Sequence, residues 1–296
     1  MNPRSPTALH PSASPASKDP ALQPNPSNAA PGELIRVNTA DGPMWVFATD
    51  VYVSRSLALY GEYCAAEANV FRQLVRPGQT VVEAGANLGS HSILLARLCS
   101  PGRLLAFEPQ RRVFQVLCTN LTINGIRNAH AYPEALGAQD GEATIPEMDF
   151  TTPGNFGGIS MGTVSGGVNL PVRVRRLDSL QLEALHFLKI DVEGWEGSVL
   201  AGATATIARH RPILYVENDR AAKQGALIAQ VASLGYRLFW HVAPLFRPDN
   251  PNRVAEDVFN NVASLNMLCL PVESPLQVTG FAEIDPANWR SPMASA

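Results

Sequence analysis

Acidic side chains that could take part in chemistry follow short apolar runs at four places in the sequence. They are Glu83, Glu108, Asp191 with Glu193, and Glu217 with Asp219. The first run leads through Gly85, Asn87 and Gly89 into a helical pattern that begins at Ser90 and His91. Glycines let a ligand approach the backbone without obstruction by a Cβ atom, and the start of a helix offers free N–H groups. This turn is a candidate ligand cradle, and a tight turn that binds nothing is the alternative.

The ligand that suits this turn is a cationic nucleoside rather than a dinucleotide. A dinucleotide fingerprint needs a glycine at position 87, which is Asn87, so pyrophosphate binding is disfavoured. The carboxylate of Glu83 also suits a cation, and S-adenosylmethionine carries both a sulfonium and an ammonium group. Glu108 ends the next apolar run, 25 positions after Glu83, where an acid in nucleoside-binding folds accepts hydrogen bonds from ribose hydroxyls. A solvent-exposed Glu108 is the alternative.

Asp191 lies in the most densely charged segment, residues 189–196, between an apolar run and a helical pattern. At the carboxyl end of a strand it would face the crevice as a general base, a metal ligand or a positioning group. Glu193 follows it, although acids in the first turn of a helix also stabilise the helix dipole. With Glu217 and Asp219, Asp191 could bind Mg²⁺, but helix capping by Asp219 explains that acid at least as well. We therefore do not favour a metal site.

Short apolar strands alternate with amphipathic helical patterns over most of the chain. Strands are predicted at residues 80–83, 103–108, 129–133, 187–191 and 213–217. Helices are predicted at residues 90–98, 111–124, 194–209 and 221–234. This alternation predicts an α/β fold, doubly wound and Rossmann-like around a mostly parallel sheet. Two further runs, residues 236–242 and 265–271, would add an antiparallel last strand at one sheet edge.

We predict one domain over residues 33–285, flanked by tails. Residues 1–32 are rich in Pro, Ser and Ala and lack aromatic residues, which is typical of a disordered tail, and residues 286–296 form a C-terminal tail. Within the domain, residues 33–78 begin with a hairpin and a helix. Residues 138–177 interrupt the alternation as a strand-rich insert.

Composition disfavours several classes of protein. An apolar content of 46% with 17% charged residues is ordinary for a globular chain. The net charge of -3 argues against a nucleic-acid partner, because nonspecific binding to phosphates needs many Lys and Arg residues. No apolar stretch approaches the roughly 20 residues that span a bilayer, so we expect no membrane span and a cytoplasmic location. The four scattered cysteines are predicted to be buried free thiols of a reducing compartment.

Together these motifs resemble those of the FkbM family of methyltransferases. The resemblance is carried by residues 60–62, 82–91, 107–109, 177–180, 188–194 and 266–271. It spans about residues 52–271 and rests on the glycine turn combined with the Lys-Ile-Asp-Val-Glu-Gly stretch. It implies a class I methyltransferase sheet, S-adenosylmethionine as methyl donor, and methylation of a hydroxyl oxygen, often on a sugar or polyketide.

The resemblance also assigns roles to single residues. The cofactor contacts it implies are Glu62, Glu83, Gly85, Asn87, Gly89, Ser90, His91, Glu108 and Glu134, with Glu108 on the ribose. Asp191 and Glu193 would stand at the reaction site. Because an alcohol has a high pKa, we expect help in removing its proton, first from Asp191 and second from His241.

Two other interpretations compete with this one. They are a nicotinamide-dependent oxidoreductase and a catalytically silent nucleoside-binding protein that keeps only the fold. The expected partner is a small-molecule or glycan acceptor. Sugar, lipid-linked glycan, polyketide and peptide hydroxyls all fit the sequence, and the oligomeric state is open.

Overall fold

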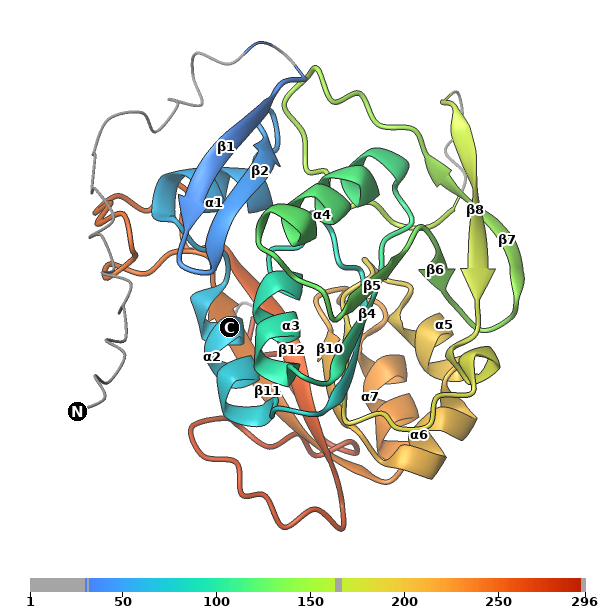
Figure 1. Cartoon of the computed structure of the whole chain (residues 1–296). Coiled ribbons are helices and arrows are strands. Elements are labelled where there is room, and N and C mark those ends of the chain that lie inside the picture. The colour runs from blue at the N-terminus through green and yellow to red at the C-terminus, as the bar shows by residue number, and fades with distance from the viewer. Residues whose placement is uncertain (1–29, 31, 163–166, 294–296) are drawn as a thin grey trace, which may run out of the picture.

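The predicted parallel sheet forms the centre of the protein. The structure is a computed structural model, and it describes residues 30, 32–162 and 167–293. Seven strands pair in the order β11-β12-β10-β9-β3-β4-β5 (Figure 1). Their bounds are β3 Thr80–Ala84, β4 Arg103–Phe107, β5 Ala129–Tyr132, β9 Phe187–Ile190, β10 Ile213–Glu217, β11 Tyr236–Pro244 and β12 Ala263–Pro271. Five neighbouring strands of this sheet run parallel, and each matches a predicted strand to within one residue: β10, β9, β3, β4 and β5. The doubly wound α/β fold is therefore confirmed.

The last strand runs antiparallel, as the sequence predicted. β12 pairs antiparallel with β10 on one side and with β11 on the other. The chain moves outward from β3 to β5, then crosses back and places β9 on the other side of β3. Ligands of open α/β sheets bind at the carboxyl ends of the strands beside such a reversal. The site is therefore expected where β3 and β9 end.

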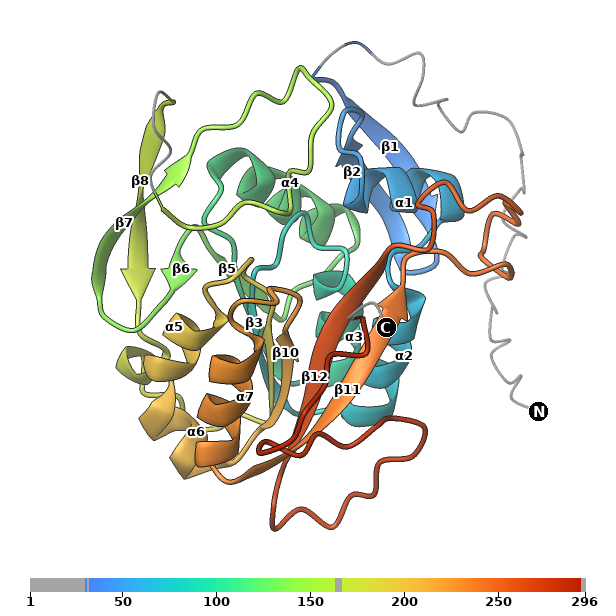
Figure 2. The ribbon, with the colours of Figure 1, turned by 180° about the vertical axis from the view of Figure 1, so that it is seen from behind.

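Six helices cover the two faces of this sheet. They are α2 Ala65–Leu74, α3 Ser92–Cys99, α4 Arg111–Ile123, α5 Glu196–Ala201, α6 Thr204–His210 and α7 Gln224–Ser233. The first three lie on one face (Figure 1) and the last three on the other (Figure 2). Side chains of each central strand alternate between the two cores, so Val81 packs with α2–α4 and Val82 packs with α5–α7. Burial on both faces explains why most residues of these strands are apolar.

One predicted helix, residues 194–209, is wrong in its extent, because the chain divides it into α5 and α6. At Gly202 an added Cβ would lie 1.9 Å from the backbone oxygen of Gly137, so the chain passes another backbone there. The free N–H groups at the start of α6 find a partner in another segment of the chain. The carboxylate of Asp178 accepts hydrogen bonds from the N–H groups of Ala205 and Thr206, at 3.1 and 2.7 Å. A distant aspartate thus caps α6.

Smaller elements surround the ends of the sheet. The predicted hairpin forms as β1 Leu34–Thr39 with β2 Gly42–Phe47, followed by α1 Val53–Tyr60, a helix that the sequence analysis missed. The insert is a second sheet of three strands in the order β6-β8-β7. Its strands are β6 Ala135–Leu136, β7 Gly141–Pro146 and β8 Asn169–Arg175, and the 3-10 turn Leu177–Leu180 leads back to the main sheet.

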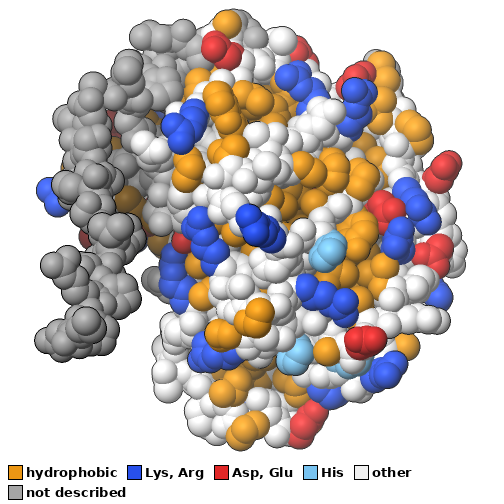
Figure 3. All heavy atoms as spheres, viewed as in Figure 1, with side chains coloured by type: hydrophobic (Ala, Val, Ile, Leu, Met, Phe, Trp, Pro, Cys, Tyr) orange, Lys and Arg blue, Asp and Glu red, His pale blue; other side chains and the backbone are white. Residues whose placement is uncertain are grey.

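Several sequence predictions fall partly outside the described residues. The predicted N-terminal tail lies outside the described residues except for residues 30 and 32, and the end of the predicted C-terminal tail lies outside them too. The division into domain and tails therefore stays a prediction. Among the residues that are described, no helix has the length and apolar character needed to cross a membrane. All four cysteines are free, and three of them are buried. On the face shown in Figure 3, Lys and Arg side chains are scattered among neutral and apolar ones.

Candidate active site

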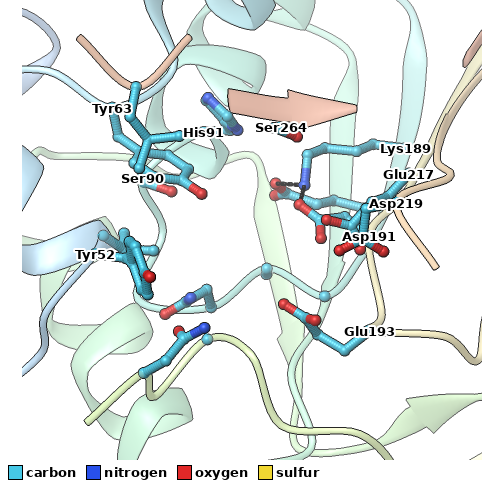
Figure 4. Close-up of a pocket in the computed structure, with 18 of the residues that line it drawn as sticks. Tyr52, Tyr63, Ser90, His91, Lys189, Asp191, Glu193, Glu217, Asp219 and Ser264 are labelled. Carbon is cyan, nitrogen blue, oxygen red and sulfur yellow. Dashed lines mark hydrogen bonds and ion pairs between the residues drawn. The ribbon is translucent and has the colours of Figure 1, made fainter. Parts of the chain in front are cut away.

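A cavity of about 250 Å³ opens where the carboxyl ends of β3, β9 and β10 meet the start of β12. Eight acidic or basic side chains from these ends, from the end of β4 and from the following loops reach it: Glu83, Glu108, Lys189, Asp191, Glu193, Glu217, Asp219 and Arg220. Tyr63, Ser90 and His91 face them from the opposite wall (Figure 4). The predicted acids at four strand ends therefore gather in one place, as parallel strands require.

The glycine turn after β3 is shaped by its neighbours in space. Gly85 has a φ of 80°, and an added Cβ would lie 1.8 Å from the backbone oxygen of Asp191. Asn87 has a φ of 50°, a conformation that asparagine tolerates better than most residues. Its side-chain oxygen accepts a hydrogen bond from the N–H of Leu88 at 2.7 Å, which holds the turn. Only glycine fits the first position, whereas asparagine stabilises the second.

Glu108 is fixed by the same turn. Its two carboxylate oxygens accept hydrogen bonds from the N–H groups of Asn87, at 2.8 Å, and Gln110, at 2.9 Å. Burial raises the pKa of Glu108 to about 7, although these two bonds act against the rise. Glu108 also lines a smaller, mostly apolar neighbouring cavity with Glu134 and Trp195. The Glu108 carboxylate thus lies between the two cavities.

Lys189 is a functional residue that the sequence analysis did not select. Its Nζ lies 2.8 Å from Asp191 Oδ2 and 3.8 Å from Glu83 Oε1 (Figure 4). Ser92 donates a hydrogen bond to the other oxygen of Glu83 at 2.6 Å. Burial lowers the pKa of Lys189, but the adjacent carboxylates outweigh burial and hold it above its ordinary value. The sequence feature that could have identified this residue is a single lysine within an otherwise apolar strand.

His91 faces the cavity as a neutral imidazole. Burial, with the charge of Lys189, lowers the pKa of His91 to about 3. Its Nδ1 lies 3.8 Å from Oε2 of Glu67, a residue of α2 that carried no sequence signal. Glu67 Oε1 accepts a hydrogen bond from Asn266 of β12 at 3.0 Å, and burial raises the pKa of Glu67 to about 7. Through its contacts with His91 and Asn266, Glu67 connects α2 and β12 to the cavity wall.

Four residues predicted to serve the site are placed differently by the structure. His241 binds the Tyr215 hydroxyl through Nδ1 at 2.7 Å and does not line the cavity, so its proposed role in proton removal is withdrawn. Glu62 also lies off the cavity, where Arg247 grips both its oxygens at 2.6 and 2.7 Å. Neither the family resemblance that suggested Glu62 nor the residue type that suggested His241 distinguishes a ligand contact from an internal pairing.

The other two, Gly89 and Glu134, lie beside the main cavity rather than in it. An added Cβ on Gly89 would stand 3.0 Å from Leu117 Cδ1, so this glycine serves the packing of the turn against α4. Glu134 lines the neighbouring cavity, and its carboxylate is paired with Arg175 at 2.7 Å. The remaining predicted residues do line the main cavity: Glu83, Gly85, Asn87, Ser90, His91, Glu108, Asp191 and Glu193.

Comparison with known sequences decides the family. The sequence model of the methyltransferase FkbM domain matches residues 83–238, which is 156 of the chain's 296 residues. The chain belongs to the FkbM methyltransferase family. The family is one of methyltransferases, so family membership replaces the nicotinamide-dependent alternative.

Individual relatives of the FkbM family are distant. The chain is 29% identical to the 31-O-demethyl-FK506 methyltransferase FkbM of Streptomyces tacrolimicus, over 61% of this chain and 81% of that protein. It is 29% identical to methyltransferase sdnD of Sordaria araneosa, over 41% of this chain and 59% of that protein. The crystal structure of methyltransferase FkbM from Methylobacillus flagellatus shares 15% identity with a TM-score of 0.41, covering 72% of this chain and 52% of that one. The match thus spans little more than half of two of these relatives.

The residues present suit a cationic cofactor. Within the described residues, the cavity brings six carboxylates together with Lys189 and Arg220 as the cations among them. S-adenosylmethionine adds a sulfonium and an ammonium charge to this surplus of acid. Two glycines of the lining pack closely against their neighbours: an added Cβ would lie 1.8 Å from the Asp191 carbonyl oxygen at Gly85 and 2.5 Å from the Asn87 side chain at Gly157.

Proposed function

We propose that this FkbM-family protein transfers the methyl group of S-adenosylmethionine to a hydroxyl oxygen of a sugar, glycan or polyketide-type acceptor. The observation that carries the proposal is the position of Asp191. Its side chain is 30% exposed at the cavity, whereas Lys189 beneath it is only 3% exposed. A carboxylate that is anchored on one oxygen and open on the other is arranged to accept a proton from an acceptor.

The cofactor would lie across the end of β3. We assign its ribose to Glu108 and its adenine to the neighbouring cavity, where Ile159, Met161 and Trp195 supply an apolar lining. The methionine portion would lie over Gly85 and Asn87, beside the acids of the larger cavity. An acid at the β4 end on the ribose follows the general pattern of nucleoside-binding α/β folds.

The bound cofactor supplies a methyl group that its sulfonium has already activated, so the protein contributes orientation and proton removal. Lys189 holds Asp191 Oδ2 at 2.8 Å and leaves Oδ1 for the acceptor hydroxyl. Oδ1 would take the hydroxyl proton as the acceptor oxygen forms its new bond to carbon. Tyr52 and Tyr63, which line the opposite side of the cavity, would help to exclude water from this position (Figure 4).

The choice of a hydroxyl acceptor is supported by a relative. The Streptomyces tacrolimicus relative is a methyltransferase of 31-O-demethyl-FK506. The neutral His91 and the acid-rich cavity agree with an uncharged or cationic acceptor, because an anion would meet several carboxylates. We therefore place hydroxyl-bearing neutral acceptors first.

A labelled-methyl assay tests the proposal. The purified protein is incubated with S-adenosylmethionine labelled in the methyl group and with panels of sugar, glycan, macrolide, peptide and amine acceptors. The expected product carries the label as an O-methyl ether, identified by its resistance to alkali and by the carbon shift of the methyl group. Label found on nitrogen, or as an alkali-labile ester, would reject the hydroxyl assignment. Cofactor binding without transfer to any panel would favour the silent binding protein.

A further inference from the structure

Three carboxylates stand unusually close at one end of the cavity. Asp191 and Glu193 follow β9, and Glu217 ends β10 beside it, with one oxygen of each within 4.8 Å of the others. Figure 4 shows these side chains on the same side of the cavity as Lys189. Like charges at this separation repel one another strongly when they are buried. A cation between them would remove the repulsion.

Glu217 gives independent evidence of a ligand. Only 9% of the surface of this residue is accessible to solvent. Its Oε2 has no hydrogen-bond partner and no solvent contact among the described residues. A buried polar atom without a partner costs roughly 1–3 kcal/mol, and more if it is charged. Because the Glu217 side chain lines the cavity and belongs to the acid cluster, this missing partner indicates that a ligand binds there.

The other two carboxylates each have an oxygen to spare. Lys189 contacts Oδ2 of Asp191, and Arg220 contacts Oε2 of Glu193. Within the part of the chain that is described, Oδ1 of Asp191 and Oε1 of Glu193 enter no hydrogen bond or ion pair. The two basic side chains therefore hold the acids in place from outside, and one oxygen from each of the three acids points inward.

We propose that Asp191, Glu193 and Glu217 bind one divalent cation, each through one carboxylate oxygen. Hard divalent cations take oxygen ligands, at about 2.0–2.1 Å for Mg²⁺ and about 2.3–2.6 Å for Ca²⁺. Two oxygens on one ion are thus at most about 4.2 Å apart for Mg²⁺ and about 5 Å for Ca²⁺. The observed spread of 4.8 Å fits a Ca²⁺-sized ion directly and Mg²⁺ after a small contraction.

With the ion bound, Asp191 Oδ1 would be its ligand rather than the free base, and a coordination position facing the cavity would take the acceptor hydroxyl and lower its pKa. The site revises the sequence prediction, in which a metal was not favoured.

Binding of Mn²⁺ to the metal-free full-length protein tests the proposal without any methyl transfer. Electron paramagnetic resonance should show one saturable Mn²⁺ per chain, with a Kd of about 1 mM or tighter, displaced by Ca²⁺ and by Mg²⁺. Glu217→Gln should weaken Mn²⁺ binding at least tenfold. The matched control is Asp219→Asn, which removes a charge from the same cavity but not one of the three ligands, and should change the Kd less than threefold.

Thermal unfolding keeps this test independent of the variant's folding and of the proposed function. Mn²⁺ should raise the melting temperature of the wild type and not that of Glu217→Gln, while S-adenosylmethionine still raises the melting temperature of both. No saturable Mn²⁺ binding would overturn the proposal. Equal losses in Glu217→Gln and Asp219→Asn would also overturn it, because they would indicate diffuse attraction to negative charge.

Discussion

Gly85 and Asp191 lie so close across the ends of β3 and β9 that a Cβ on Gly85 would be 1.8 Å from the Asp191 carbonyl oxygen. The N–H of Asp191 also donates a hydrogen bond to Ala84, the residue before Gly85, at 3.1 Å. The glycine that lines the cavity therefore also positions the carboxylate that we assign to proton removal. The proposed cofactor cradle and the proposed reaction site are therefore joined by direct backbone contact.

Gly85→Ala should disrupt this contact, and Gly78→Ala is its control. Both glycines have a positive φ, of 80° and 85°, but a Cβ on Gly78 would meet nothing within 4 Å. We expect Gly78→Ala to lower the free energy of unfolding by about 1 kcal/mol, the cost of the conformation alone. Gly85→Ala should lose about 3 kcal/mol or more and weaken S-adenosylmethionine binding at least tenfold. Denaturant titration and calorimetry measure both; equal losses would contradict the steric argument.

Asp191→Asn should separate chemistry from binding. The amide keeps the shape of the side chain but cannot accept a proton, so we expect turnover to fall about 10²–10⁴-fold. The Kd for S-adenosylmethionine should change only a few-fold, because Asp191 is assigned to the acceptor rather than to the cofactor. Asp140→Asn, at an exposed aspartate paired with Arg176, serves as control and should keep full turnover. Loss of cofactor binding in Asp191→Asn, measured calorimetrically, would move this residue to the cofactor site.

Glu67→Gln should change how stability depends on pH. Burial raises the pKa of Glu67 from 4.5 to about 7, so the folded protein holds this proton more tightly than the unfolded chain. Its contribution to stability is complete below pH 4.5 and is lost as the pH rises through 7. Gln has no proton to lose. Raising the pH from 5 to 8 should therefore increase the free energy of unfolding of the variant, relative to that of the wild type, by up to roughly 3 kcal/mol. Urea titrations at both pH values measure this difference, and a gain at pH 5 instead would contradict it.

Glu62→Gln tests the reassignment of that residue. Arg247 pairs with both oxygens of Glu62, which joins the loop after β11 to the segment between α1 and α2. Because Arg247 is 39% exposed, we expect the substitution to cost only about 1 kcal/mol of stability. The Kd for S-adenosylmethionine should stay within about twofold, since Glu62 does not line the cavity. Arg247→Gln should have the same stability effect. A large loss of affinity in Glu62→Gln alone would restore its cofactor role.

The sequence by itself determined the order and class of the elements and the edge of the sheet that carries the site. Apolar runs that are buried on both faces and separated by helical patterns leave few alternatives to a parallel sheet. Acids at the ends of parallel strands must then meet at one edge, which is why Glu83, Glu108 and Asp191 were found together. The glycine turn was readable because its backbone conformation restricts the residue types there.

Only the tertiary structure decided which polar side chains face the ligand and which pair internally. His241 and Tyr215, Glu62 and Arg247, and Glu67 and Asn266 come from segments far apart in the chain, and no local pattern encodes such pairs. The break at Gly202 was hidden for the same reason, because the obstructing backbone belongs to Gly137. Local periodicity reports which face of an element is buried, whereas contacts between distant segments are fixed only when the layers pack.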